Sequence, residues 1–389
     1  MPSTMRENRT LVSLNLAVFF MMLGVGMIMA LLPQKVIDLT GSGSTVGFLA
    51  SAFAISYIVL QVPIGNLSDK FGFKFFLFSG YLICSVTGLL YYFAASANLI
   101  FLGRLFQGAG EAPIWALAPA LLSIKFPAAK GRVMGIYNAV IHVGLTIGPL
   151  LGIAVLKIWP GNQAFLFYAV VCFIGAIIIL FGVENVEQNR DPNRAKMNLS
   201  KIMALMADQR TLAALAGITL YGVGYGIFLT IIPAFLISTK DFSQNYISLF
   251  FSLFYVAISL SQVITGHFSD KFGREKFMIL GLIVTALGVG IFPALNQPYI
   301  TIILTLAGAG LGIFYISSMA YMNETVPNDL KGTISGAYYL FWGLGFFVGP
   351  ILIGKLGELP LKSLGFYLFA LALLLNVFAI TYLSRRQTQ

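Results

Sequence analysis

Apolar runs long enough to cross a bilayer recur along the whole 389-residue chain. A helix of about 20 residues spans the hydrocarbon core of a membrane. Only 10% of the residues are charged, against about 25% in soluble domains. The sequence therefore predicts an all-α membrane protein with twelve spans, at roughly 11–32, 46–67, 74–94, 98–122, 132–156, 163–183, 211–237, 245–268, 275–294, 299–323, 332–356 and 362–383.

One long polar stretch, residues 184–210, separates spans six and seven. We therefore expect an N-terminal bundle at 1–183, a cytoplasmic linker at 184–210 and a C-terminal bundle at 211–389. The first apolar run is too long for the core of a signal peptide, so we expect no cleavable leader.

Basic residues set the orientation of such a protein, because cytoplasmic loops carry the excess of Lys and Arg. With a cytoplasmic N-terminus, eighteen of the 24 Lys and Arg lie on the cytoplasmic side and five on the other. This predicts a multi-pass protein of the plasma or inner membrane with both termini inside. The net charge of +10 is spread over short loops, so we expect the lipid bilayer and no nucleic acid as a partner.

The two halves repeat one another, which puts a substrate path at their pseudo-twofold interface near the bilayer midplane. The stretch 65–80 matches 266–281 at an offset of 201 positions, and 130–152 matches 331–354 at the same offset. The tripeptide Gly-Ala-Gly at 108–110 returns at 308–310.

Three motifs carry a family resemblance. They are Gly65-x-Leu67-Ser68-Asp69-Lys70-x-Gly72-x-Lys74, Arg104-x-x-Gln107-Gly108-x-Gly110 and Gly135-x8-Gly144-x3-Gly148-Pro149-x2-Gly152. They resemble the loop 2–3, helix 4 and helix 5 signatures of the major facilitator superfamily, the last one associated with its proton-coupled exporters. The resemblance implies a protein of two six-helix bundles that is most similar to the twelve-helix drug:proton antiporters. We expect it to work as a monomer, with no cofactor and no metal.

In the family, the loop motif latches the cytoplasmic side, with a carboxylate braced against a neighbouring helix N-terminus and basic groups. The alternative is a topological anchor with a tight turn, for which Gly72 supplies the freedom. The resemblance and the repeat together assign gating to Gly65, Asp69, Lys70, Gly72, Lys74, Arg132, Asp270, Lys271 and Gly273.

The helix 5 motif implies a packing seam against the other half that favours export. Its residues are Gly135, Gly144, Gly148, Pro149 and Gly152. Small residues four positions apart also let helices approach in ordinary packing, which is the alternative reading.

Arg104 and Glu111 stand in an otherwise apolar span, seven residues apart and so on one helix face. A charge at the bilayer centre costs at least about 2.5 kcal/mol, so both face the protein interior or a wet cavity. The second half has leucines at the matching positions, so the fold itself does not require these charges. We expect Glu111 to carry protons, assisted by Arg104 and by a relay through His142; a buried brace between helices is the alternative.

An aromatic wall facing one acid suits an amphipathic, neutral or cationic small molecule, although such residues also serve ordinary membrane packing. The expected substrate-binding residues are Glu111, Gln107, Trp115, Tyr221, Tyr225, Tyr315, Tyr338 and Trp342. We predict an exporter that exchanges protons for such compounds by alternating access. The alternatives are a lipid or metabolite translocator that is not proton-driven and a transport-inactive sensor.

The sequence does not indicate an enzyme. No nucleophile–base cluster, phosphate-binding loop or metal-ligand grouping is present. Cys84 and Cys172 both lie within apolar runs, where small buried thiols are expected rather than a disulfide framework.

Overall fold

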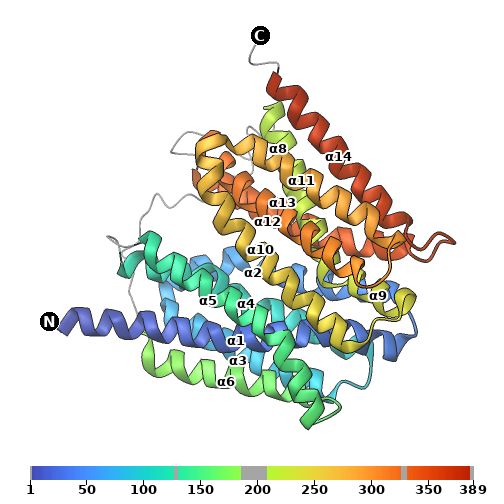
Figure 1. The fold of residues 1–389 in the computed structure, drawn as a ribbon. Helices are drawn as coiled ribbons and strands as arrows, with labels where there is room; N and C mark the ends of the chain where they lie inside the picture. Colours follow the sequence, from blue (N-terminus) through green and yellow to red (C-terminus); the bar gives the residue numbers. More distant parts are fainter. Residues whose placement is uncertain (1, 127–129, 185–207, 326–330, 386–389) are drawn as a thin grey trace. The chain divides into compact units, whose positions relative to one another are not determined.

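The computed structural model describes residues 2–126, 130–184, 208–325 and 331–385. Every regular element within these ranges is a helix, and each of the twelve predicted spans contains one (Figure 1). Eleven helices in these ranges are long and apolar enough to cross a membrane. The span absent from that set is helix α4, which carries Arg104, Gln107 and Glu111.

The chain divides into two compact units. Unit 1 comprises Met1–Ser42, Phe48–Arg190 and Asp241–Ser252, and unit 2 comprises Gly43–Gly47, Asp191–Lys240 and Leu253–Gln389. The division falls within the predicted linker, most of which lies outside the described residues, so the predicted domain boundaries stay a prediction.

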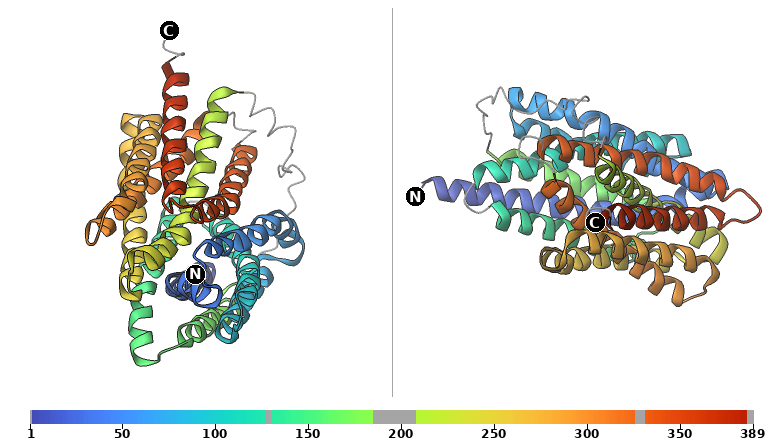
Figure 2. Two further views of the ribbon diagram at one scale, coloured as in Figure 1. Left: turned by 90° about the vertical axis from the view of Figure 1, so that its right-hand side faces the viewer. Right: turned by 90° about the horizontal axis from the view of Figure 1, so that it is seen from above.

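The helices of unit 1 follow the chain in order. They are α1 (Pro2–Thr40), α2 (Phe48–Phe71), α3 (Phe73–Phe93), α4 (Ala97–Lys125), α5 (Lys130–Ile158) and α6 (Gln163–Gly182). Helix α1 packs mainly on α5 and α6, and α4 packs on α2 and α3. The left view of Figure 2 looks nearly along these helices.

Unit 2 repeats this arrangement. Its elements are α8 (Gln209–Leu229), α9 (Ile231–Lys240), α10 (Gln244–Phe272), α11 (Arg274–Ile291), α12 (Tyr299–Thr325), α13 (Lys331–Leu356) and α14 (Leu364–Arg385), with short 3₁₀ turns at Ser44–Gly47 and Phe292–Ala294. Helix α8 packs on α13, and α11 packs on α12 and α14, as their counterparts do in unit 1. The first turns of α10 belong to unit 1, where Gln244 Nε2 donates to the Ala30 carbonyl oxygen at 2.9 Å.

The seventh predicted span is interrupted, with α8 ending at Leu229 and α9 beginning at Ile231. Pro233 explains the break, because a proline ring clashes with the carbonyl group four residues earlier and the residue lacks an N–H donor. The Thr230 hydroxyl donates to the Gly226 carbonyl oxygen at 2.7 Å and so satisfies one freed acceptor at the break.

The Gly-Ala-Gly tripeptide lets α4 fit between two neighbours. A Cβ on Gly108 would overlap the Phe53 carbonyl oxygen of α2, and one on Gly110 would lie 2.7 Å from Cys84 Sγ of α3. The second copy does the same in α12, where Gly308 meets α10 and Gly310 meets α11. This part of the repeat is therefore architectural.

The helix 5 glycines pack against α1 of their own unit. A Cβ on Gly148 would overlap the Leu23 carbonyl oxygen, and one on Gly144 would lie 3.0 Å from the Leu23 nitrogen. Gly152 lies against Met27, whereas Gly135 has no atom within 4 Å of its Cβ position. The nearest neighbours of Gly144, Gly148 and Gly152 therefore lie on α1, and the predicted seam against the other half stays a prediction.

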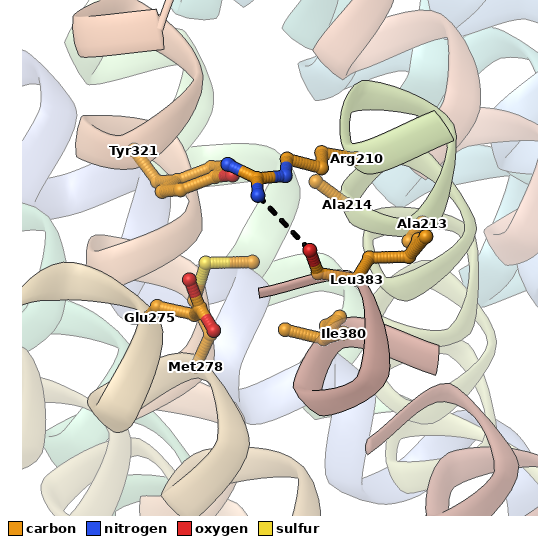
Figure 3. Close-up of a pocket in the computed structure, with 8 residues that line it drawn as sticks. All are labelled: Arg210, Ala213, Ala214, Glu275, Met278, Tyr321, Ile380 and Leu383. Carbon is orange, nitrogen blue, oxygen red and sulfur yellow. Dashed lines mark hydrogen bonds between the residues drawn. The ribbon is translucent and has the colours of Figure 1, made fainter. Parts of the chain in front are cut away.

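Two arginines close the two bundles in the same way. Arg9 on α1 donates to the Phe181 carbonyl oxygen of α6 at 2.7 Å, and Arg210 on α8 donates to the Leu383 carbonyl oxygen of α14 at 3.0 Å (Figure 3). Arg9 and Arg210 stand 201 positions apart, the offset of the repeat. Because the last carbonyl groups of a helix lack partners within it, each arginine caps the final helix of its bundle.

The start of α8 is also capped. Asp208 accepts from the Thr211 nitrogen at 2.9 Å and from the Thr211 hydroxyl at 2.7 Å. Partial burial acts to raise the pKa of Asp208, but the bonds from Thr211 and the nearby Arg210 prevail and lower it. An ionised acid at this helix N-terminus also suits the helix dipole.

The close approach of α5 to α1 can be tested with two alanines. Gly148→Ala should lower the free energy of unfolding by about 1–3 kcal/mol, because the added methyl group must displace backbone atoms of α1. Gly135→Ala is the matched control and should stabilise the helix slightly, by about 0.5–1 kcal/mol. Thermal unfolding in detergent, followed by circular dichroism, measures both; equal effects would contradict the packing described.

Candidate functional site

A line of buried polar side chains runs along one face of α4. The exposed fractions of Arg104, Gln107 and Glu111 are 2%, 0% and 4%. Their spacing of three and four residues places them on one face of the helix. Helices α2 and α3 cover α4, so these groups depend on protein partners for their hydrogen bonds.

Arg104 bonds to groups on its own helix and on neighbouring helices. Its Nε donates to the Leu49 carbonyl oxygen of α2 at 2.9 Å, and its Nη1 donates to Gln107 Oε1 at 2.8 Å. The same Nη1 lies 3.4 Å from Met29 Sδ of α1, and the guanidinium carbon lies 4.7 Å from the Phe53 ring centre. Arg104 therefore braces α1, α2 and α4.

Gln107 connects the arginine to the acid. Its Oε1 accepts from both Arg104 and the Tyr91 hydroxyl, the latter at 2.8 Å, and its Nε2 donates to Glu111 Oε1 at 2.9 Å. Because a guanidinium can only donate, the amide oxygen must face Arg104. Arg104 thereby sets the orientation of Gln107 and turns the amide nitrogen toward Glu111.

Glu111 accepts hydrogen bonds and makes no direct ion pair with Arg104 in the described residues. Its second oxygen, Oε2, accepts from Trp115 Nε1 at 3.1 Å. Trp115 is 36% exposed and is the most exposed of the four hydrogen-bonded residues Arg104, Gln107, Glu111 and Trp115. The acid is thus buried but is not locked against a fixed cation.

The second unit lacks this chemistry. The alignment of the Gly-Ala-Gly tripeptides sets Leu304 and Leu311 against Arg104 and Glu111, and both leucines are buried in α12. An apolar core serves the same packing position there. The polar line of α4 is therefore an addition to the fold rather than a requirement of it.

His142 lies on α5 with its Nδ1 buried and without a hydrogen-bond partner. Among the described contacts, none joins His142 to Glu111. The relay between them stays a prediction.

The predicted aromatic residues of unit 2 form one cluster across α8, α12 and α13. Tyr221 lies 5.5 Å from Tyr315 and 6.1 Å from Tyr225, measured between ring centres. Tyr315 lies 6.2 Å from Tyr338, and Tyr225 lies 6.3 Å from Trp342. The Tyr338 hydroxyl is 3.1 Å from the Ser318 hydroxyl.

Several members of these groups carry no signal in the sequence. Phe254 of α10 and Phe346 of α13 complete the aromatic cluster around Tyr225, at 5.8 and 6.1 Å. Tyr91 and Phe53, which contact Gln107 and Arg104, lie on helices α3 and α2 in aromatic-rich runs typical of membrane packing. Only tertiary packing singles them out.

The two copies of the loop motif make the same turn. Gly72 and Gly273 precede α3 and α11 with φ of 81° and 99°, a region that favours glycine. In the second copy, Arg274 pairs with Asp270 and with Glu324 of α12, the latter at 3.0 Å. This network joins α10, α11 and α12.

The other gating residues are placed only in part. Lys271 Nζ lies 5.6 Å from the ring centre of its neighbour Phe272, and Lys74 is half-buried near the start of α3. The side chains of Asp69, Lys70 and Arg132, and Gly65, lie outside the described residues. The gating role stays a prediction for all of these positions.

No three His, Cys, Asp or Glu side chains gather as metal ligands within the described part of the chain. Cys84 and Cys172 are buried free thiols, as predicted.

Long apolar helices in two repeated units, with a buried acid in one of them, are typical of multi-pass membrane transporters. The family model for the Major Facilitator Superfamily matches residues 14–243 and 214–389. The chain belongs to this family.

Proteins of similar sequence include a transporter and two resistance proteins. It is 25% identical to an uncharacterized MFS-type transporter of Methanocaldococcus jannaschii over 94% of this chain and 95% of the relative. It is 23% identical to multidrug resistance protein 1 of Bacillus subtilis and 24% identical to the quinolone resistance protein NorA of Staphylococcus aureus, each over 92% of both chains.

Solved transporters share the fold. The nucleoside transporter NupG superposes with a TM-score of 0.77 at 15% identity, covering 96% of this chain and 98% of that one. A bacterial homologue of the human lysosomal transporter Spinster gives a TM-score of 0.75 at 15% identity, covering 97% and 95%. At identities this low, the comparison establishes a shared fold and nothing about function.

Arg104 and Arg9 should differ in how much they stabilise the protein, because Arg104 joins several helices whereas Arg9 only caps one. Arg104→Lys should lower the free energy of unfolding by about 1.5–3 kcal/mol, because an ammonium group cannot reproduce two diverging bonds to Leu49 and Gln107. Arg9→Lys should change it by less than about 0.5 kcal/mol, because one ammonium bond can cap Phe181 at an exposed site. Thermal unfolding in detergent compares the two, and the reverse order would refute the brace.

Proposed function

We propose that this transporter is a proton-coupled exporter of amphipathic, neutral or cationic small molecules. Glu111 carries the proposal: it is a buried acid in unit 1 that no cation of the described residues neutralises directly and that the repeat lacks. Such a group can exchange a proton with water when its surroundings change, because desolvation disfavours its charged form. Its neutral and ionised forms then favour different states of the transporter.

The names of the relatives support export of drug-like compounds. Two of them are called multidrug or quinolone resistance proteins, and both align with nearly the whole of this chain. The helix 5 motif points the same way. We propose a monomer in the plasma or inner membrane with both termini in the cytoplasm, which exchanges protons for substrate by alternating access.

The aromatic cluster of unit 2 supports the choice of substrate. Tyr221, Tyr225, Tyr315 and Trp342 offer ring faces that bind apolar surface and attract cations. Glu111 supplies negative charge in unit 1 when it is ionised. A compound with an apolar body and a positive charge suits each of these groups.

Glu111→Gln tests the coupling. The variant keeps the size and a hydrogen-bonding amide but cannot release a proton, so proton-driven exchange should be abolished while the protein stays folded. Transport into vesicles with an imposed pH gradient measures this, with size-exclusion profiles to verify folding.

Asp38→Asn is the matched control for Glu111→Gln, because Asp38 is an exposed acid that accepts only from Gln34 within the described contacts. Its exchange should match that of the unaltered protein. Full proton coupling in Glu111→Gln would refute the role of the acid.

Thermal-shift screening tests the substrate class. Cationic amphipathic dyes should raise the unfolding temperature selectively over sugars and lipids, because a ligand that prefers the native state stabilises it. Tyr225→Leu should weaken the dye affinity about 2- to 30-fold, the range expected for a lost cation–π contact of roughly 0.5–2 kcal/mol. Tyr299→Leu, at the exposed start of α12, should leave it unchanged. Stabilisation by lipids or sugars alone would favour a translocator of those compounds instead.

A further inference from the structure

The hydrogen-bond partners of Glu111 are both donors. Gln107 presents its amide nitrogen, because Arg104 holds the amide oxygen on the other side, and the indole N–H of Trp115 can only donate. An ionised carboxylate is satisfied by this pair. A protonated Glu111 carries a hydrogen that needs an acceptor, and neither partner provides one.

The two donors differ in burial and in the number of hydrogen bonds that hold them in place. Gln107 is fully buried and is bonded to Tyr91 and Arg104 as well as to Glu111. The indole of Trp115 has a single polar hydrogen, which it gives to Glu111, and a third of the residue is exposed. When Glu111 gains a proton, Trp115 is therefore the partner that leaves.

The direction of the exposed Trp115 follows from its position around the axis of α4. At about 100° per residue, Phe106 lies opposite Trp115 around the helix, and Glu111 lies about 40° from it. Phe106 is 42% exposed and belongs to the apolar outer face with Leu102. The exposed part of Trp115 therefore lies on the polar face of the helix rather than on the face typical of lipid contact.

We propose that Trp115 couples proton binding to substrate binding: its indole is bound to ionised Glu111 and is released when Glu111 takes a proton from water. The freed N–H then donates to water or to the substrate, and the ring changes the aromatic surface that the substrate meets. Trp115 acts here as a positioning residue, because the position of its indole depends on the protonation state of Glu111. This inference rests on the proposed function.

Other titratable groups surround the acid. Those with an electrostatic influence on it or from it are Arg104 on α4, Tyr81, Cys84 and Tyr91 on α3, and Tyr168 and Cys172 on α6. On α5, Tyr137 and His142 are also titratable. Phenols and thiols ordinarily titrate above pH 8 and guanidinium above pH 12, so among these groups only Glu111 and His142 ordinarily titrate below pH 8.

Tryptophan fluorescence tests the release directly. The chain has three tryptophans, so the double variant Trp159→Phe, Trp342→Phe leaves Trp115 as the single emitter. Acidification from about pH 8 to 4 should shift its emission to longer wavelength, as the indole moves from the buried acid to water. Adding Glu111→Gln should remove the shift, and adding His142→Gln should leave it. Trp115→Phe, Trp342→Phe, which retains only Trp159, is the control and should not respond.

Trp115→Phe tests the consequence for transport. The ring remains but the donor is lost, so the ionised acid loses one charge-assisted bond and binds a proton about tenfold more tightly. The midpoint of the pH profile of exchange should move up by about one pH unit. A purely structural role of the ring would leave the profile where it is.

Four outcomes would separate the two proposals. A shift of Trp115 emission that survives Glu111→Gln, or emission that stays constant while exchange depends on pH, would overturn the coupling role of Trp115. A shift that depends on Glu111 in a protein without proton-driven exchange would support the release of Trp115 and refute the proposed function. If the protein shows neither the emission shift nor proton-driven exchange, both the coupling role of Trp115 and the proposed function are refuted.

Discussion

The hydrogen bond from Arg104 to Gln107 determines what the acid of α4 meets. Because the guanidinium can only donate, it fixes which end of the Gln107 amide turns toward Glu111. Glu111 is then surrounded by donors, one rigid and one part-exposed. Reversing the amide would offer an acceptor to a protonated acid and remove the reason for Trp115 to respond.

The internal repeat separates architecture from chemistry. Both units place Gly-Ala-Gly between two neighbouring helices, and in both an arginine on the first helix caps the last helix. Only unit 1 carries the polar line, since Leu304 and Leu311 occupy the matching sites in α12. Burying charges costs free energy that the leucines of unit 2 avoid, and for this reason we propose a function for Arg104 and Glu111.

Sequence reasoning identified the helices, the repeat and the residues of α4, because apolar length and periodicity are local properties. It did not identify α1 as the close neighbour of the helix 5 glycines, since a spacing of four predicts close approach without naming the partner. It also treated the seventh span as continuous, although Pro233 was visible, because prolines elsewhere, such as Pro33 in α1, sit inside unbroken helices.

The amino-acid sequence by itself determined that the chain spans a membrane many times, that its two halves repeat one topology, and that one span contains both an acid and a cation. Hydrophobicity and spacing suffice for that. Tertiary structure alone decided that Glu111 bonds to Gln107 and Trp115 and that Arg104 bonds to Leu49. Residues on one helix face have several possible partners, and packing against α1, α2 and α3 selects among them.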